Sequence, residues 1–224
     1  NASPVTSPYT NITAATQTLF IRLENITTGC FDTTTLELLV DPLPVIPTIE
    51  VYELCDYTNS GDLQEVFDLN TKDSEIIDGQ NVSVAYFETE TDATNNSNEL
   101  TGTYQNTSTP QTLYVALTDL TTGCRATGSF ELIVNPLPTT TTMSALPICD
   151  DDTDGLGAFM LTSKDTEALG GQTGVTVSYH ETQSDADTNA SPLSSPYTNT
   201  TPSSQIIFIR LENNTTGCFS TMPL

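Results

Sequence analysis

The segment Leu113-Tyr114-Val115-Ala116-Leu117, followed by Thr121-Thr122-Gly123-Cys124 and Phe130-Glu131-Leu132-Ile133-Val134, decides the fold of this chain. Leu113, Val115 and Leu117 fall on one face of an extended segment, as does the set Phe130, Leu132 and Val134. Such alternation is typical of a strand with one face toward a core. The Gly-containing turn between the two segments joins them into a β-hairpin.

This hairpin recurs at a fixed interval. The Thr-Thr-Gly-Cys turn ends at Cys30, Cys124 and Cys218, which are spaced by 94 residues, and Cys55 returns as Cys149 at the same interval. Periods of 20 to 50 residues are typical of solenoids and propellers, whereas 94 residues suit one small β-sandwich. We therefore predict an all-β chain of tandem immunoglobulin-like β-sandwich domains.

Other segments fill out each repeat. Alternating residues predict strands at 82–87 and 175–180, and short strands are expected at 66–69, at 158–161 and near Tyr104. Single helical turns are expected at 72–77 and 164–169, and residues 91–103 are interpreted as a polar, turn-rich stretch. The total of about six or seven strands per repeat is that of an immunoglobulin-like sandwich.

The repeat boundaries follow from the proline-rich segments Pro42-Leu43-Pro44 and Pro136-Leu137-Pro138, which favour extended, semi-rigid spacers. Residues 1–44 are interpreted as the C-terminal part of a first repeat and residues 45–138 as a complete one. Residues 139–224 are interpreted as a third repeat truncated before its last strand, because no apolar run follows Cys218. We expect this window to belong to a longer protein with further repeats of the same kind.

The charge is one-sided, with 29 acidic residues against five Lys and Arg and a net charge of −24. Such a chain repels phosphate backbones and anionic membranes, so we expect no nucleic-acid partner. The sequence also lacks an apolar run long enough to span a membrane. Divalent cations are the small partners that this charge favours, although self-repulsion and solubility explain it equally well.

Paired cysteines at a fixed register in Thr-rich β-domains indicate an oxidising compartment. The favoured interpretation pairs them within a repeat, as Cys55–Cys124 and Cys149–Cys218, which leaves Cys30 for a partner outside the window. The alternative pairs them across the linker, as Cys30–Cys55 and Cys124–Cys149. If the topology is that of a standard sandwich, however, the two cysteines of one repeat lie at opposite ends, too far apart to bridge.

The sharpest local motif is Asp150-Asp151-Asp152-Thr153-Asp154-Gly155. Asp150, Asp152 and Asp154 have the spacing of oxygen ligands in an EF-hand-like calcium loop, with Gly155 for the turn. Position twelve is Leu161, so a closing carboxylate would come from elsewhere, for example Glu181 or Asp185. The sister loop keeps Asp56 but loses two acids. An ordinary Asp- and Gly-rich turn that needs no ion is the alternative.

Catalysis is not expected. His180 is the sole histidine of the sequence and its sister position is Phe87, so His180 is interpreted as a surface strand residue. One histidine provides neither a Ser/His/Asp triad nor a histidine-based zinc site.

Several motifs together resemble the repeats of giant surface proteins of Bacteroidota. They are Cys-Asp-Asp-Asp-Thr-Asp-Gly at 149–155, Ser-Pro-Tyr-Thr-Asn at 195–199, Ile-Arg-Leu-Glu-Asn at 209–213, the Thr-Thr-Gly-Cys turns and the Pro-Leu-Pro linkers. The resemblance implies secretion by the type IX system, a cell-surface or extracellular location, and roles in adhesion or gliding. No binding residue carries over from it.

The expected function is therefore that of a non-catalytic, stiff adhesin stalk, whose repeated weak contacts raise avidity. Surface polysaccharide or the substratum would be its partner. A first alternative is a structural subunit of an extracellular filament or sheath, built by self-assembly of the repeats. A second alternative is an accessory carbohydrate-binding region of a secreted hydrolase.

Overall fold

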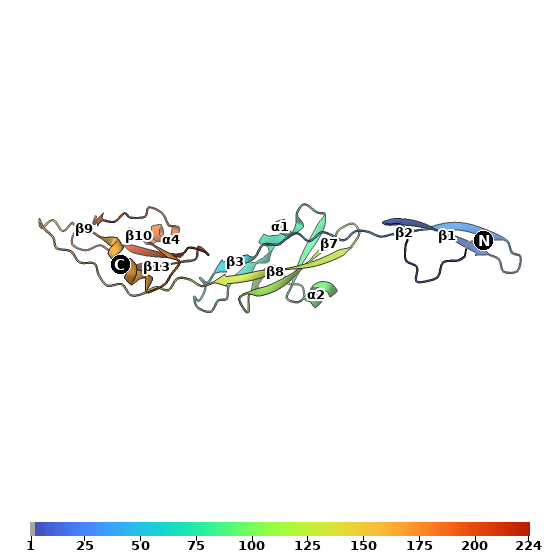
Figure 1. Ribbon diagram of the computed structural model, residues 1–224, viewed down its shortest axis with the longest axis horizontal. Helices are drawn as coiled ribbons and strands as arrows, with labels where there is room; N and C mark the ends of the chain where they lie inside the picture. Colours follow the sequence, from blue (N-terminus) through green and yellow to red (C-terminus); the bar gives the residue numbers. More distant parts are fainter. Residues whose placement is uncertain (1–2) are drawn as a thin grey trace. The chain divides into compact units, whose positions relative to one another are not determined.

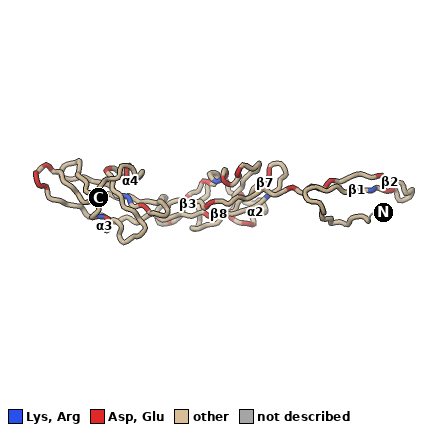
Figure 2. The backbone as a smooth tube through the Cα atoms, turned by 45° about the horizontal axis from the view of Figure 1, so that its top comes forward, with Lys and Arg blue, Asp and Glu red and all other residues tan. Residues whose placement is uncertain are grey.

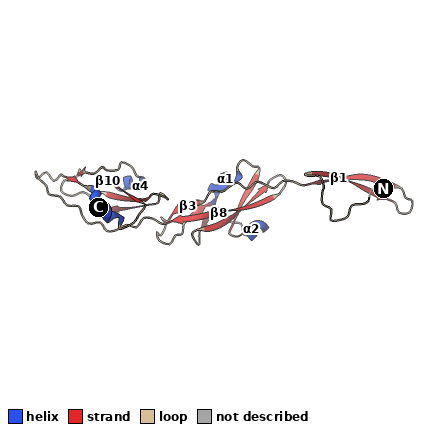
Figure 3. Cartoon of the chain, in the orientation of Figure 1, coloured by secondary structure: helices blue, strands red, loops and turns tan. Residues whose placement is uncertain are grey.

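The computed structural model describes residues 3–224. Strands dominate it and the helices are short, as Figures 1 and 3 show. The chain divides into two compact units, which are described separately. The first comprises residues 3–49, 69–101 and 113–129, and the second comprises residues 50–68, 102–112 and 130–224. The strands β7 (Gln111–Asp119) and β8 (Arg125–Asn135) each contribute to both units. The expected all-β, sandwich-like fold is confirmed.

In the first unit, β1 (Thr16–Glu24) and β2 (Phe31–Leu39) form an antiparallel hairpin in which Leu19 pairs with Leu36. The hairpin has the expected alternation, but its apolar side chains stay exposed, with Leu23 at 77 % and Leu36 at 47 %. No described residue buries this face, because residues 3–44 supply the hairpin without the strands that cover it in the other repeats.

The same unit contains the body of the second repeat. A 3-10 turn η1 (Leu69–Lys72) leads into α1 (Asp73–Ile77), then β5 (Val82–Phe87) and α2 (Glu90–Asn95). β5 pairs antiparallel with β7, and α2 packs on the sheet through the buried residues Phe87, Ala93 and Ala116. This packing buries β7 on both faces, where the alternation predicts a half-buried strand.

The second unit begins with β3 (Tyr52–Cys55), which runs parallel to the end of β8 and places Cys55 opposite Asn135. β4 (Val66–Asp68) and β6 (Thr103–Gln105) form a small antiparallel pair beside it. The strands follow the order β3-β8-β7-β5 in the main sheet. The expected short strand near Tyr104 is thus confirmed as β6.

The third repeat lies wholly in the second unit and repeats this plan. Its elements are β9 (Ala158–Phe159), η2 (Leu161–Lys164), α3 (Asp165–Leu169), β10 (Val175–His180), α4 (Gln183–Thr188), β11 (Tyr197–Thr198), β12 (Phe208–Asn213) and β13 (Phe219–Pro223). The main sheet has the order β10-β12-β13, and β9 pairs with β11.

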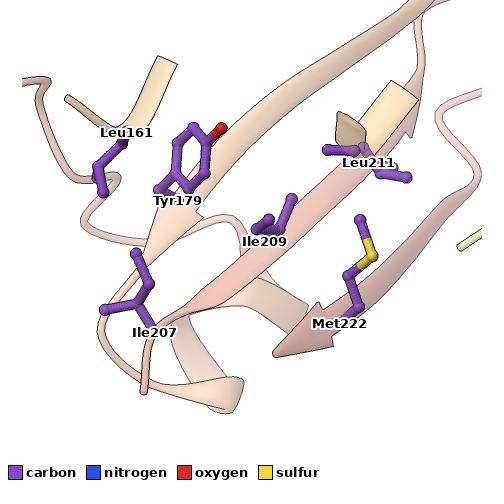
Figure 4. Close-up of a cluster of buried hydrophobic side chains, with 7 residues drawn as sticks. Leu161, Tyr179, Ile207, Ile209, Leu211 and Met222 are labelled. Carbon is purple, nitrogen blue, oxygen red and sulfur yellow. The ribbon is translucent and has the colours of Figure 1, made fainter. Parts of the chain in front are cut away.

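The core of the third repeat gathers side chains from all three strands of that sheet (Figure 4). Tyr179 of β10, Ile209 and Leu211 of β12 and Met222 of β13 face Leu161 of η2, and each is at most 5 % exposed. Figure 4 shows Ile209 between the flanking strands, so truncating it opens the centre of the core.

Two expectations are corrected here. The third repeat does have a last strand: β13 pairs with β12 from Glu212↔Phe219 to Phe208↔Pro223, because backbone pairing extends a hairpin even without the continuous apolar run found in the other repeats. The polar stretch after β5 also contains the helix α2. Thr89 caps it by accepting a hydrogen bond from the Asp92 N–H, a Thr-x-x-Asp signal that the sequence displays.

Candidate inter-repeat joint

A disulfide links Cys55 of the second repeat to Cys218 of the third. The two residues are 163 positions apart in sequence, and their Cα atoms lie 5.5 Å apart. β3 delivers Cys55 to the far end of β8, next to Asn135. Cys218 is presented by the Thr-Thr-Gly-Cys turn, which the Asn213 side chain organises by accepting hydrogen bonds from the Thr215 and Thr216 N–H groups. Both cysteines belong to the second unit.

Aromatic and polar contacts surround the bond. The rings of Tyr57 and Phe219 meet edge to face, with centroids 5.6 Å apart, a favoured arrangement for aromatic pairs. The Arg210 guanidinium lies over the Phe219 ring, 3.4 Å from the ring centroid. A cation–π attraction stabilises this arrangement. The Ser220 hydroxyl donates to the carbonyl of Pro138 at 2.7 Å, which ties the hairpin to the linker.

Asp56, next to the disulfide, is only 1 % exposed. Its Oδ2 accepts a hydrogen bond from the Gly61 N–H. Its Oδ1 has no hydrogen-bond partner among residues 3–224. The equivalent Asp150 is exposed, and its carboxylate accepts from the N–H groups of Asp152, Thr153 and Gly155. In the second repeat the corresponding N–H of Thr58 donates to Glu65 instead, which leaves Asp56 short of donors.

All three predicted disulfides that involve Cys55 or Cys218 are wrong. Cys55 pairs neither with Cys124 nor with Cys30, and Cys218 does not pair with Cys149. The reason is the length of β8: its eleven residues separate Asn135, beside Cys55, from the turn that carries Cys124 by about 35 Å. A disulfide spans Cα atoms roughly 4.4–6.8 Å apart. Within the described residues Cys30, Cys124 and Cys149 are unpaired, so the Cys124–Cys149 pairing is not formed either.

The acidic loop of the third repeat brings Asp150, Asp152 and Asp154 together, with ligand oxygens within 4.8 Å of one another. All three side chains are exposed. Hydrogen bonds from backbone N–H groups, above all that of Gly155, lower the pKa of Asp150. Asp152 and Asp154 likewise accept from the N–H groups of Asp154 and Leu156. The loop therefore has three convergent carboxylates and also an internal set of turn hydrogen bonds.

The closing carboxylates considered for this loop are used elsewhere. Glu181 accepts a hydrogen bond from the Tyr197 hydroxyl at 2.7 Å, and the Asp185 carboxylate accepts one from the Thr182 hydroxyl at the start of α4. Neither joins the three-aspartate group. A cleft of about 480 Å³ opens beside the loop and is lined partly by Ile148, Phe159 and Tyr197.

His180 is fully buried, which corrects its interpretation as a surface residue. Its Nδ1 lies 2.7 Å from the carbonyl of Ala190, and its Nε2 lies 2.9 Å from the Ser178 hydroxyl. On the neighbouring strand Arg210 is also buried and donates to the carbonyls of Ala186 and Asp187. These polar groups hold α4 against the sheet. In the second repeat, Phe87 holds α2 against the sheet by apolar contact instead.

The sequence reasoning missed a pair of glutamine clamps at the starts of the two repeats. Gln172 accepts from the Thr139 N–H and donates to its carbonyl, both at 2.8 Å. Gln80 holds Val45 in the same way at 2.9 Å. Val45 and Thr139 directly follow the Pro-Leu-Pro segments. The recurrence of Gln after Gly79 and after Gly171 is the signal for this clamp.

The charge of the chain is spread along it rather than gathered in one patch. In Figure 2 acidic positions recur along every part of the chain, with isolated basic positions among them. Within residues 3–224, no helix has the length and apolar character needed to cross a membrane.

Three stretches of the chain, residues 1–44, 51–138 and 145–224, match the family described as the Flavobacterium inter-domain disulphide bond domain. No curated protein matches the chain. The matched stretches cover most of the sequence, and the Cys55–Cys218 bond joins the second match to the third. The chain therefore belongs to the Flavobacterium inter-domain disulphide bond domain family, of which it carries three consecutive repeats.

Proposed function

We propose that this chain is part of the stalk of a secreted cell-surface adhesin, which acts in attachment or gliding and has no catalytic role. The observation that carries the proposal is the disulfide between consecutive repeats. Membership of a disulfide-bonded repeat family indicates an extracellular repeat protein, because disulfides persist in oxidising compartments. A covalent bond across each joint is useful where neighbouring domains must resist being pulled apart.

The details of the joint support this role. Besides the disulfide, the Tyr57–Phe219 pair and the Ser220–Pro138 hydrogen bond fix the third repeat to the second. The glutamine clamps at Val45 and Thr139 hold the residues that follow each proline-rich linker. Semi-rigid linkers of this kind keep a binding end far from the cell, and repetition raises avidity.

Type IX secretion and calcium binding at Asp150, Asp152 and Asp154 belong to the same proposal. The partner would be surface polysaccharide or the substratum. Deletion of the encoding gene in the native bacterium tests the role directly. We expect loss of surface attachment or of gliding with normal growth, and restoration by the intact gene. A deletion strain that attaches and glides like its parent would overturn the proposal.

Negative-stain electron microscopy of the native surface material separates this role from a filament or sheath. Isolated thin strands support the stalk, whereas ordered fibres with a regular lateral packing overturn it in favour of the filament.

A further inference from the structure

The Cys55–Cys218 bond has a defined direction along the array. Cys55 is the first cysteine of its repeat, and Cys218 is the second cysteine of the next repeat. By the 94-residue period, Cys149 is the first cysteine of the third repeat, while Cys30 and Cys124 are second cysteines. We infer that every repeat follows this rule, so that the array is a covalent ladder with two rails.

The second-cysteine half of the joint is built alike in all three repeats. Asp119 accepts hydrogen bonds from the Thr121 and Thr122 N–H groups, as Asn25 does from those of Thr27 and Thr28. The glycine before each of these cysteines has a positive φ of 71–75°. These are the features that present Cys218 to Cys55. Cys30 and Cys124 are thus presented by the same turn without a disulfide partner in the described chain.

The first-cysteine half is repeated as well. Gly155 donates its N–H to Asp150 after Cys149, as Gly61 does to Asp56 after Cys55. Cys149 is exposed and unpaired within residues 3–224. The turn of a following repeat would cover it in the way that the turn at Cys218 covers Cys55 and Asp56. Each bond forms when two thiols lose two protons and two electrons to a disulfide-carrying oxidoreductase, which becomes a dithiol.

The ladder follows from counting residues. From a second cysteine to the next first cysteine, as from Cys124 to Cys149, the chain runs 25 residues through β8 and the linker. The disulfide of that first cysteine then connects it to the second cysteine of the following repeat. One rail therefore uses only 25 residues of backbone for every two repeats, and a second rail runs through the alternate linkers. The 69 residues from Cys55 to Cys124, which contain the other elements of the folded domain, connect the two rails as a rung.

This arrangement removes every element of a domain except its β8-type strand, which is already extended, from the path of tension. Force applied along the array passes through the linkers and disulfides of the rails, so that unfolding a domain releases no length. Cleavage of the backbone between the two cysteines of one repeat cuts a rung and leaves both rails whole. Cleavage within a linker cuts one rail and leaves the other. The inference rests on the proposed stalk role for its purpose, but its test does not depend on that role.

Single-molecule pulling on this chain, held by its two ends, tests the bypass. In the oxidised protein we expect extension of the segment before Cys55 and no release from residues 56–217. After reduction, the chain between Cys55 and Cys218, whose sequence separation is 163, adds up to about 560 Å of contour length. The Cys149→Ser variant is the control, since it removes a thiol outside the bond and should behave as the parent chain does. Equal contour release with and without reductant would overturn the bypass.

Disulfide mapping of the native full-length protein tests the ladder. Digestion without reduction should yield the Cys149 peptide joined to a Thr-Thr-Gly-Cys peptide of the following repeat. A Cys149 peptide that is reduced, or joined to any other cysteine, would overturn the rule. These outcomes concern connectivity alone, so they stay distinguishable from the attachment and gliding phenotype, which tests the proposed function.

Discussion

Tyr57 and Phe219 come from different repeats, and their rings meet edge to face at an interplanar angle of 63° beside the Cys55–Cys218 bond. Phe219 also lies under the Arg210 guanidinium. The joint thus extends the packing of the third repeat to a residue of the second. Stability of the third repeat should therefore depend on its neighbour.

Removal of the disulfide is expected to destabilise this part of the chain. In the chain-entropy estimate, opening a closed loop of 163 residues costs about 5 kcal/mol. The measurement is chemical denaturation of the variant carrying both Cys55→Ser and Cys218→Ser. Cys149→Ser, which changes an unpaired thiol, serves as the control. Equal midpoints for the double variant and the control would contradict the prediction.

Ile209→Ala should cost about 2–5 kcal/mol, because it leaves a cavity in a close-packed core. Ile209 is 0 % exposed and lies at the centre of the cluster in Figure 4. Ile21 has the same register in the hairpin of residues 16–39 but is 44 % exposed. Ile21→Ala is therefore the matched control and should change the unfolding free energy little. Denaturant unfolding followed by circular dichroism compares the two variants.

Gln172→Ala should loosen the start of the third repeat without unfolding it. Its amide makes two hydrogen bonds to Thr139 and one to the Leu169 carbonyl, and the net contribution of one such bond is about 1 kcal/mol. Hydrogen exchange at the Thr139 amide should become faster, while exchange in β12 stays slow. Gln80→Ala should have the same local effect at Val45. Unchanged exchange at both amides would show that the clamps are not formed in solution.

Acid should weaken the Lys164–Glu167 pair. Hydrogen bonds from Lys164 and from the Ser144 N–H and hydroxyl lower the Glu167 pKa from 4.5 to about 2. A lowered folded-state pKa gives stability that is present above pH 4.5 and is lost as the pH falls toward 2. We expect Glu167→Gln to flatten the pH dependence of unfolding in that window. An unchanged slope in the variant would assign the acid sensitivity to other carboxylates.

Calcium is expected to raise the thermal midpoint of the third repeat, because an ion that binds the folded loop stabilises it. The convergent carboxylates of Asp150, Asp152 and Asp154 provide the oxygens. Asp152→Asn and Asp154→Asn should each weaken the effect, and a chelator should remove it. Magnesium is the control ion. A calcium shift that persists in both variants would place binding elsewhere on this acidic chain.

The sequence by itself determined the repeat, the hairpins and the identity of the core. Period-two alternation places Leu113, Val115 and Leu117 on one face whatever surrounds them, and all three are fully buried. The interval between Cys30, Cys124 and Cys218 likewise gave the domain size directly. Local backbone geometry and burial are enough for such inferences.

Only the tertiary structure decided which cysteines meet. Disulfide partners depend on which strand ends come together in space, and four cysteines in two repeats already allow several pairings. The pairing of β3 with the end of β8 puts Cys55 about a strand length from Cys124 and within bonding distance of Cys218. The burial of His180 could not be predicted from the sequence for a similar reason, since α4 covers the face of β10 that the sequence pattern assigns to solvent. Contacts between segments far apart in the chain carry no local pattern, and in this protein they form the joint.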